Sequence, residues 1–154
     1  MNDRSKLTPL DPIGLTRQLC EIESTTYHEG AVGDFLGRFL AGRGWEVEKT
    51  PVAQPPESAT AGPRWNVYAG PAGKTPDLVF STHMDTVPPY IPFSEDAEFM
   101  YGRGVSDAKG IIAAQVAAAE VLRTAGFWIK AGGELACSAG APAPREGGWM
   151  VSLF

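Results

Sequence analysis

An apolar run that ends in polar residues of the metal-binding type restricts the fold more than any other feature of the sequence. Residues 78–82 form a nearly continuous apolar run, a pattern typical of a strand covered on both faces of its sheet. His83 follows directly, and Asp85 stands two residues further on. Side chains at positions i and i+2 of a strand project to the same face. The sequence therefore predicts an imidazole and a carboxylate side by side where a buried strand ends.

The rest of the chain alternates helical and extended patterns. Apolar residues recur at helical spacing, or alanine dominates, in three stretches: residues 12–24, 29–41 and 108–124. Alternating or β-prone residues predict three further strands: residues 45–48, 65–69 and 99–101. This order predicts an α/β layered domain in which helices flank a mixed or parallel sheet.

Composition excludes several classes of protein. The chain has 154 residues, 44% of them hydrophobic and 20% charged, which suits one globular domain. The formal net charge of −5 disfavours a nucleic-acid partner, and no window approaches the roughly 18 apolar residues of a membrane span. The polar first residues do not resemble a secretory signal, and Cys20 and Cys137 lack metal-type spacing. We expect a reduced, cytoplasmic protein with Cys20 in its core.

A second chemical motif, YGRGVSDAKG, spans residues 101–110. It places Asp107 between a glycine-rich loop and the start of the alanine-rich helix. Asp107 taken alone can be a helix cap. A phosphate-binding loop does not fit, because Lys109 precedes Gly110 and no hydroxyl follows. The dinucleotide-binding pattern fails as well, because Asp107 stands where its third glycine belongs.

The two motifs together suggest a ligand site. His83, Asp85 and Asp107 all lie at a strand end or in a loop that leads into a helix, where open α/β sheets build such sites. An imidazole combined with carboxylate oxygens suits zinc or a similar divalent ion, with Asp85 orienting the ring of His83. The alternative is a structural polar pair at the end of a strand.

The motif HMDTVP, followed by YGRGVSDAKG and an alanine-rich helix, resembles the co-catalytic zinc metallopeptidases and deacylases. This family includes acetylornithine deacetylase, succinyl-diaminopimelate desuccinylase, aminoacylase and glutamate carboxypeptidase. The resemblance covers roughly residues 15–123 and implies the N-terminal half of a zinc-exopeptidase-like catalytic domain. It implies that His83 is a ligand of one metal, that Asp85 is a catalytic residue supporting that site, and that Asp107 bridges two metals. It also implies a cis peptide bond between Asp107 and Ala108.

The resemblance further implies how the loop and the reaction are arranged. Gly102, Gly104 and Gly110 would shape the loop, and we interpret Lys109 as structural. In similar enzymes, water bridging two zinc ions attacks an amide carbonyl while a glutamate takes the proton, and cobalt can replace zinc. The implied substrate is a small N-acyl amino acid or a peptide. Members of the family are often homodimers that associate through a separate domain.

The last part of the sequence departs from the family. A strand ending in a Glu-Glu pair is expected there, followed by a later acidic ligand and a histidine ligand. Residues 127–154 show neither strand nor helix periodicity, and Glu134 and Glu146 stand isolated. We therefore expect residues 1–126 to be the N-terminal part of the catalytic domain and residues 127–154 to be an unpatterned tail, from a shifted frame or a truncated gene.

This departure has functional consequences. We expect weak or absent zinc binding and an inactive chain without the dimerisation domain, and His28 is not expected to be a ligand. The alternative is a non-catalytic remnant or interaction module that keeps the fold fragment.

Overall fold

The computed structural model describes residues 8–56, 62–70, 78–124 and 151–153. Its helices are α1 (Pro12–Cys20), α2 (Gly30–Gly42) and α3 (Lys109–Thr124). Its strands are β1 (Glu46–Val52), β2 (Arg64–Gly70), β3 (Phe80–Thr82), β4 (Ser94–Glu95), β5 (Met100–Tyr101) and β6 (Val151–Leu153). None of the helices in these ranges is long and apolar enough to cross a membrane.

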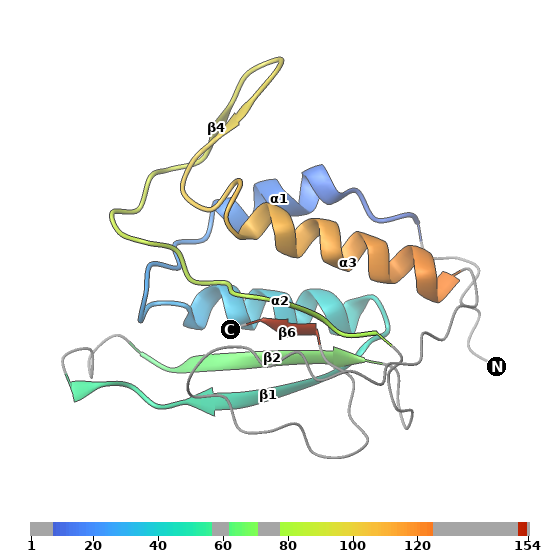
Figure 1. Ribbon diagram of the computed structural model, residues 1–154, viewed down its shortest axis with the longest axis horizontal. Coiled ribbons are helices and arrows are strands. Elements are labelled where there is room, and N and C mark those ends of the chain that lie inside the picture. Colours follow the sequence, from blue (N-terminus) through green and yellow to red (C-terminus); the bar gives the residue numbers. More distant parts are fainter. Residues whose placement is uncertain (1–7, 57–61, 71–77, 125–150, 154) are drawn as a thin grey trace.

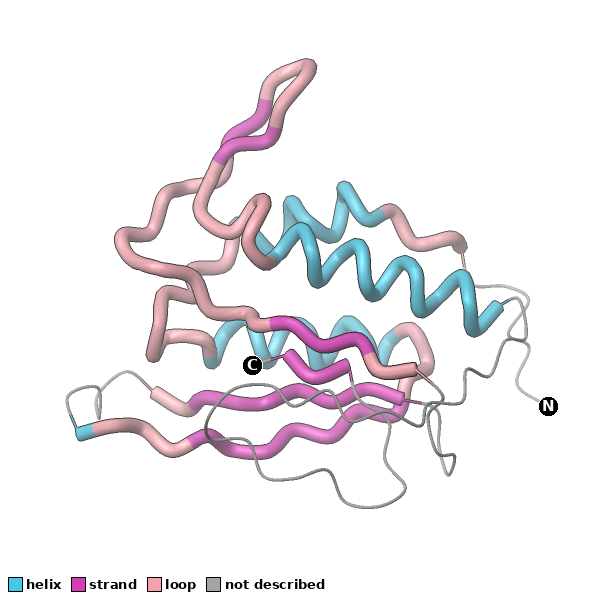
Figure 2. Tube along the Cα trace, viewed as in Figure 1, coloured by secondary structure: helices cyan, strands magenta, loops and turns pink. Residues whose placement is uncertain are grey.

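Four of the strands form a mixed sheet, which confirms the predicted α/β class. Their order is β1-β2-β6-β3 (Figures 1 and 2). β1 pairs with β2 antiparallel, with Glu46 opposite Gly70 at one end and Val52 opposite Arg64 at the other. β6 is antiparallel to β2 and parallel to β3. The tail was predicted to be unpatterned, yet its residues 151–153 form a strand inside the sheet.

The described residues form one hydrophobic core between the helices and the sheet. Its buried members come from all three helices, from β2 and from the segment after β3: Leu15, Leu19, Val32, Leu36, Leu40, Val67, Ala69, Met84, Ile112, Ala113 and Val116. The three helices lie on the same side of β1 and β2 (Figure 1). The apolar run at residues 78–82 differs from its prediction: β3 is only three residues long and half-buried, and Leu78 is exposed.

Two element boundaries differ from the sequence pattern for tertiary reasons. α1 ends at Cys20, before the predicted residue 24, because the following segment leaves the helix and pairs with Thr86. β1 continues to Val52, four residues beyond the predicted end of the strand at residue 48. Its Pro51 is tolerated because β1 is the first strand in the sheet order, and an edge strand can spare a backbone donor.

A buried carboxylate joins the ends of α2 and α3. The indole nitrogen of Trp45 donates to Glu120 Oε1 over 2.6 Å, and Arg123 donates to the other carboxylate oxygen over 2.8 Å. Arg43 forms an ion pair with the same carboxylate at 3.3 Å, while the Arg123 guanidinium lies over the Trp45 ring. Glu120 is 4% exposed, so its charge depends on these partners.

The hairpin β4–β5 stands away from the helices and leads into the glycine-rich loop (Figure 1). Its base is tied to α1 by an ion pair between Arg17 and Glu95, whose atoms are 2.7 Å apart. Arg103 holds the other side, because its side chain donates to the carbonyl oxygen of Pro89 and its backbone N–H to that of Ile91. The loop that carries Asp107 therefore starts from a fixed base.

Candidate metal centre

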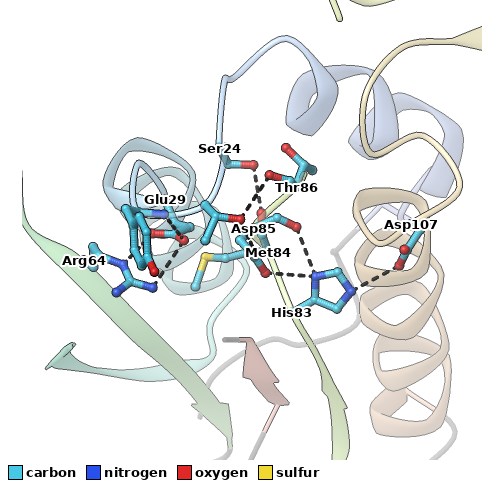
Figure 3. Close-up of polar contacts among 10 residues, drawn as sticks. Ser24, Glu29, Arg64, His83, Met84, Asp85, Thr86 and Asp107 are labelled. Carbon is cyan, nitrogen blue, oxygen red and sulfur yellow. Dashed lines mark hydrogen bonds and ion pairs between the residues drawn. The ribbon is translucent and has the colours of Figure 1, made fainter. Parts of the chain in front are cut away.

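The imidazole of His83 lies between two carboxylates (Figure 3). Its Nδ1 is 3.1 Å from Oδ1 of Asp85 and 3.0 Å from the backbone oxygen of that residue. Its Nε2 is 3.1 Å from Oδ1 of Asp107, a residue 24 positions later in the chain. The structure thus brings together all three side chains that the two sequence motifs predicted to meet.

Asp107 reaches His83 because the preceding loop turns tightly. Gly102 and Gly104 have φ angles of +139° and +93°, a region of backbone conformation that favours glycine. A Cβ at Gly104 would also lie 2.8 Å from the side chain of Lys109. The Asp107–Ala108 peptide bond is cis, as the resemblance implied.

Lys109 anchors this loop from inside the protein. Its side chain is fully buried, and its ammonium group donates to the carbonyl oxygen of Ile22, just beyond α1. Its backbone N–H donates to the carbonyl oxygen of Gly104 over 2.9 Å. Burial lowers the pKa of Lys109, and the nearby Cys20 and Glu23 oppose that shift. These contacts agree with a structural role for Lys109 in holding the loop.

The electrostatics of the site favour positive charge on the ring of His83. Partial burial alone would lower the pKa of His83. The hydrogen bond with the Asp85 backbone carbonyl and the carboxylates of Asp85 and Asp107 outweigh that effect, so the pKa of His83 is raised. The position beside Nε2 and the Asp107 carboxylate is therefore suited to a cation, either a proton or a metal ion.

The donor atoms fit a divalent metal ion. Two ligands of a tetrahedral zinc ion at about 2.0–2.2 Å lie about 3.3–3.6 Å from each other, a few tenths of an ångström more than the 3.1 Å that separates His83 Nε2 from Asp107 Oδ1. The side chains of His83 and Asp107 are 43% and 78% exposed, so an ion can reach them from solvent. Within the described part of the chain no group of three or more such donors gathers, so these residues supply two ligands.

Several supporting residues were not identified from the sequence. Ser24 donates its hydroxyl proton to the carbonyl oxygen of Met84 over 2.8 Å, and Thr26 donates to Oδ2 of Asp85 over 3.0 Å. These pairs are separated by 60 and 59 positions. No periodicity marks them, and only the polar run after α1 could have indicated a role.

The remaining predicted residues lie away from the site or outside the described ranges. Cys20 is fully buried in the core, as predicted. His28 is exposed in the loop before α2. Glu134 and Glu146, together with most of the predicted tail, lie outside the described residues.

Comparison with known proteins agrees with this geometry. Residues 79–137, which include both motifs, match the family described as Peptidase family M20/M25/M40. A "Probable carboxypeptidase" from Paracoccidioides brasiliensis (strain Pb03) is 40% identical over 128 residues, which cover 76% of this chain and 29% of that protein. A second probable carboxypeptidase, from Emericella nidulans, is 42% identical over 128 residues, which again cover 76% of this chain and 29% of that protein. The chain thus spans less than a third of the length of these relatives.

The structure of a tripeptidase from Staphylococcus aureus superposes with a TM-score of 0.57 at 20% sequence identity. The superposed region covers 77% of this chain and 34% of the tripeptidase chain. The described fold therefore corresponds to about a third of the tripeptidase chain. The chain is therefore similar to part of the M20 peptidases in both sequence and fold.

Proposed function

We propose that this chain is the N-terminal part of a metal-dependent hydrolase of amide bonds, with His83 and Asp107 as metal ligands. The observation that carries the proposal is the convergence of two separated motifs on one point, where Nε2 of His83 lies 3.1 Å from Asp107. Asp85 orients the ring from the opposite side. Zinc is the metal favoured by this combination of imidazole and carboxylate, and cobalt is a workable substitute.

Each residue has a separate task in this proposal. His83 offers a nitrogen lone pair at a strand end, where little reorganisation is needed on binding. Asp85 accepts the Nδ1 proton and so leaves Nε2 as the atom that faces the ion. Asp107 adds a second donor and negative charge. A bound divalent ion supplies Lewis-acid polarisation of an amide carbonyl and activation of water.

The substrate in this proposal is a peptide or an N-acyl amino acid. The relatives named "Probable carboxypeptidase" and the tripeptidase fold support peptides. Deacylation in the manner of acetylornithine deacetylase is the alternative within the same chemistry. We propose that the 154-residue chain does not itself turn over substrate, because a catalytic zinc site takes three protein ligands and a general base, whereas the described residues provide two ligands.

Metal binding tests this proposal directly. Titration of the purified chain with Co²⁺, followed by its visible absorption, is expected to show weak saturable binding. The variant His83→Ala is expected to bind at least about 10-fold more weakly, since loss of a ligand should exceed the 10–100-fold effect of losing a supporting residue. His28→Ala is the matched control and should leave the isotherm unchanged, because His28 lies exposed in the loop before α2 and outside both motifs.

Two results would contradict the proposal. Equal Co²⁺ affinity in the His83→Ala variant and the parent chain would exclude His83 as a ligand. Metal-dependent hydrolysis of an N-acetyl amino acid or a dipeptide by the 154-residue chain would show that it is catalytically complete.

A further inference from the structure

We propose that Thr26 is a positioning residue for the metal centre, acting on His83 through the carboxylate of Asp85. The inference rests on the proposed function, because it assigns a task to a residue behind the proposed ligands. Thr26 acts on the ring of His83 indirectly, because the shorter hydrogen bond of its hydroxyl goes to the carboxylate of Asp85.

The first observation is how the Asp85 carboxylate is held. One oxygen, Oδ1, is 3.1 Å from His83 Nδ1, and the other, Oδ2, accepts the hydroxyl proton of Thr26 over 3.0 Å. A second acceptor for that hydroxyl, the carbonyl oxygen of Thr86, is 3.5 Å away. The shorter bond to a charged oxygen is the stronger one. The two bonds of Asp85 lie on different oxygens, so together they define the rotation of its carboxylate plane.

The second observation is that backbone hydrogen bonds place Thr26 beside Asp85. Residues 24–26 run alongside residues 84–86 as a short parallel bridge between Thr25 and Thr86. The N–H of Thr86 donates to the carbonyl oxygen of Ser24 over 2.8 Å, and the N–H of Thr26 donates to that of Thr86 over 3.0 Å. These bonds do not involve the Thr26 side chain. Removing its hydroxyl should therefore leave the backbone in place and release only the carboxylate.

The consequence concerns which nitrogen of His83 carries the proton. With Asp85 held, Nδ1 remains protonated and donates to it, and Nε2 is left to face Asp107 and an ion. With the Asp85 carboxylate released, Nδ1 keeps the backbone oxygen of Asp85 as an acceptor but loses the charged one. The preference then weakens, and the neutral ring shifts toward the form protonated at Nε2, which can donate to Asp107. The protonated Nε2 form cannot bind a metal ion through that atom. Thr26 thus favours, before an ion binds, the tautomer of His83 whose Nε2 is free to bind it.

Long-range ¹H–¹⁵N NMR of the metal-free chain, labelled at histidine, measures this preference. The chain contains two histidines, so the exposed His28 serves as an internal reference. In Thr26→Val, the fraction of neutral His83 protonated at Nδ1 is expected to fall by at least about half, while His28 is unchanged. In Thr26→Ser, which keeps the hydroxyl, that fraction is expected to match the parent chain.

Thr25→Val is the matched control. It removes a hydroxyl from the adjacent residue, which donates to Glu23 over 3.1 Å and does not contact Asp85. The His83 signals should remain those of the parent chain. The proposal is overturned if Thr26→Val leaves the His83 tautomer unchanged, or if Thr25→Val or Thr26→Ser shifts it as much as Thr26→Val does.

A parallel Co²⁺ titration separates this inference from the proposed function. Thr26→Val is expected to weaken Co²⁺ binding several-fold, with an unchanged thermal unfolding midpoint. If the parent chain binds no Co²⁺ and the tautomer still shifts in Thr26→Val, the proposed metal site fails while the positioning role stands. If the parent chain binds Co²⁺ and Thr26→Val changes neither readout, only the positioning role fails.

Discussion

Replacing Gly110 by alanine is expected to lower the free energy of unfolding by about 3 kcal/mol or more. Gly110 lies in the first turn of α3, where a Cβ would overlap the backbone carbonyl oxygen of Val105. A backbone atom cannot rotate away as a side chain can, so either the helix or the loop must move. Such a movement would also displace Asp107, which is three residues away.

Urea unfolding followed by circular dichroism measures this effect. Gly42→Ala is the matched control, because Gly42 is also helical and a Cβ there meets nothing within 4 Å. Alanine at that position should leave stability unchanged or raise it by up to about 1 kcal/mol. Equal unfolding midpoints for Gly110→Ala and the parent chain would show that the loop at Val105 yields easily.

The second large effect is expected at Glu120. Replacing this residue by alanine should cost about 3–5 kcal/mol, the usual penalty when one partner of a buried ion pair is removed. The side chains of Arg43 and Arg123, 17% and 11% exposed, would lose the carboxylate that balances their charge. The indole N–H of Trp45 would lose its acceptor as well.

An exposed ion pair provides the comparison. Lys49 and Asp34 lie 2.6 Å apart with side chains about one-third exposed, so Asp34→Ala is expected to cost no more than about 1 kcal/mol. Thermal or urea unfolding of both variants, with Trp fluorescence as a second probe, ranks them. A cost for Glu120→Ala as small as that for Asp34→Ala would mean that the guanidinium groups find water or new partners.

Much of the local structure was predictable from the sequence. The periodicity of apolar residues located α1, α2 and α3 within a few residues, because a helix repeats its buried face every three to four positions. The pairing of His83 with Asp85 was predictable for the same reason, since both follow one strand at a spacing of two. The buried position of Cys20 followed from its place among the apolar residues of α1.

Other features depended on contacts between distant segments. α1 ends at Cys20 because Ser24 and Thr25 pair with the segment after β3, about 60 residues away. The short strand β6 belongs to the sheet because β2 and β3 offer it partners on both sides. Its three residues are too few for their pattern to indicate a strand. Pairing between segments far apart in the sequence leaves no mark in the local residue pattern.

The same distinction between local pattern and distant contacts applies to the candidate metal centre. The chemistry was readable from residue types and spacing: an imidazole, two carboxylates and a glycine-rich loop before a helix. The folded chain was needed to show that Nε2 of His83 faces Asp107, that Thr26 donates to the Asp85 carboxylate, and that Lys109 anchors the loop to the segment just after α1. The physical reason is that residue type and spacing act over a few positions. The orientation of a side chain is set instead by hydrogen bonds that form only when the chain has folded.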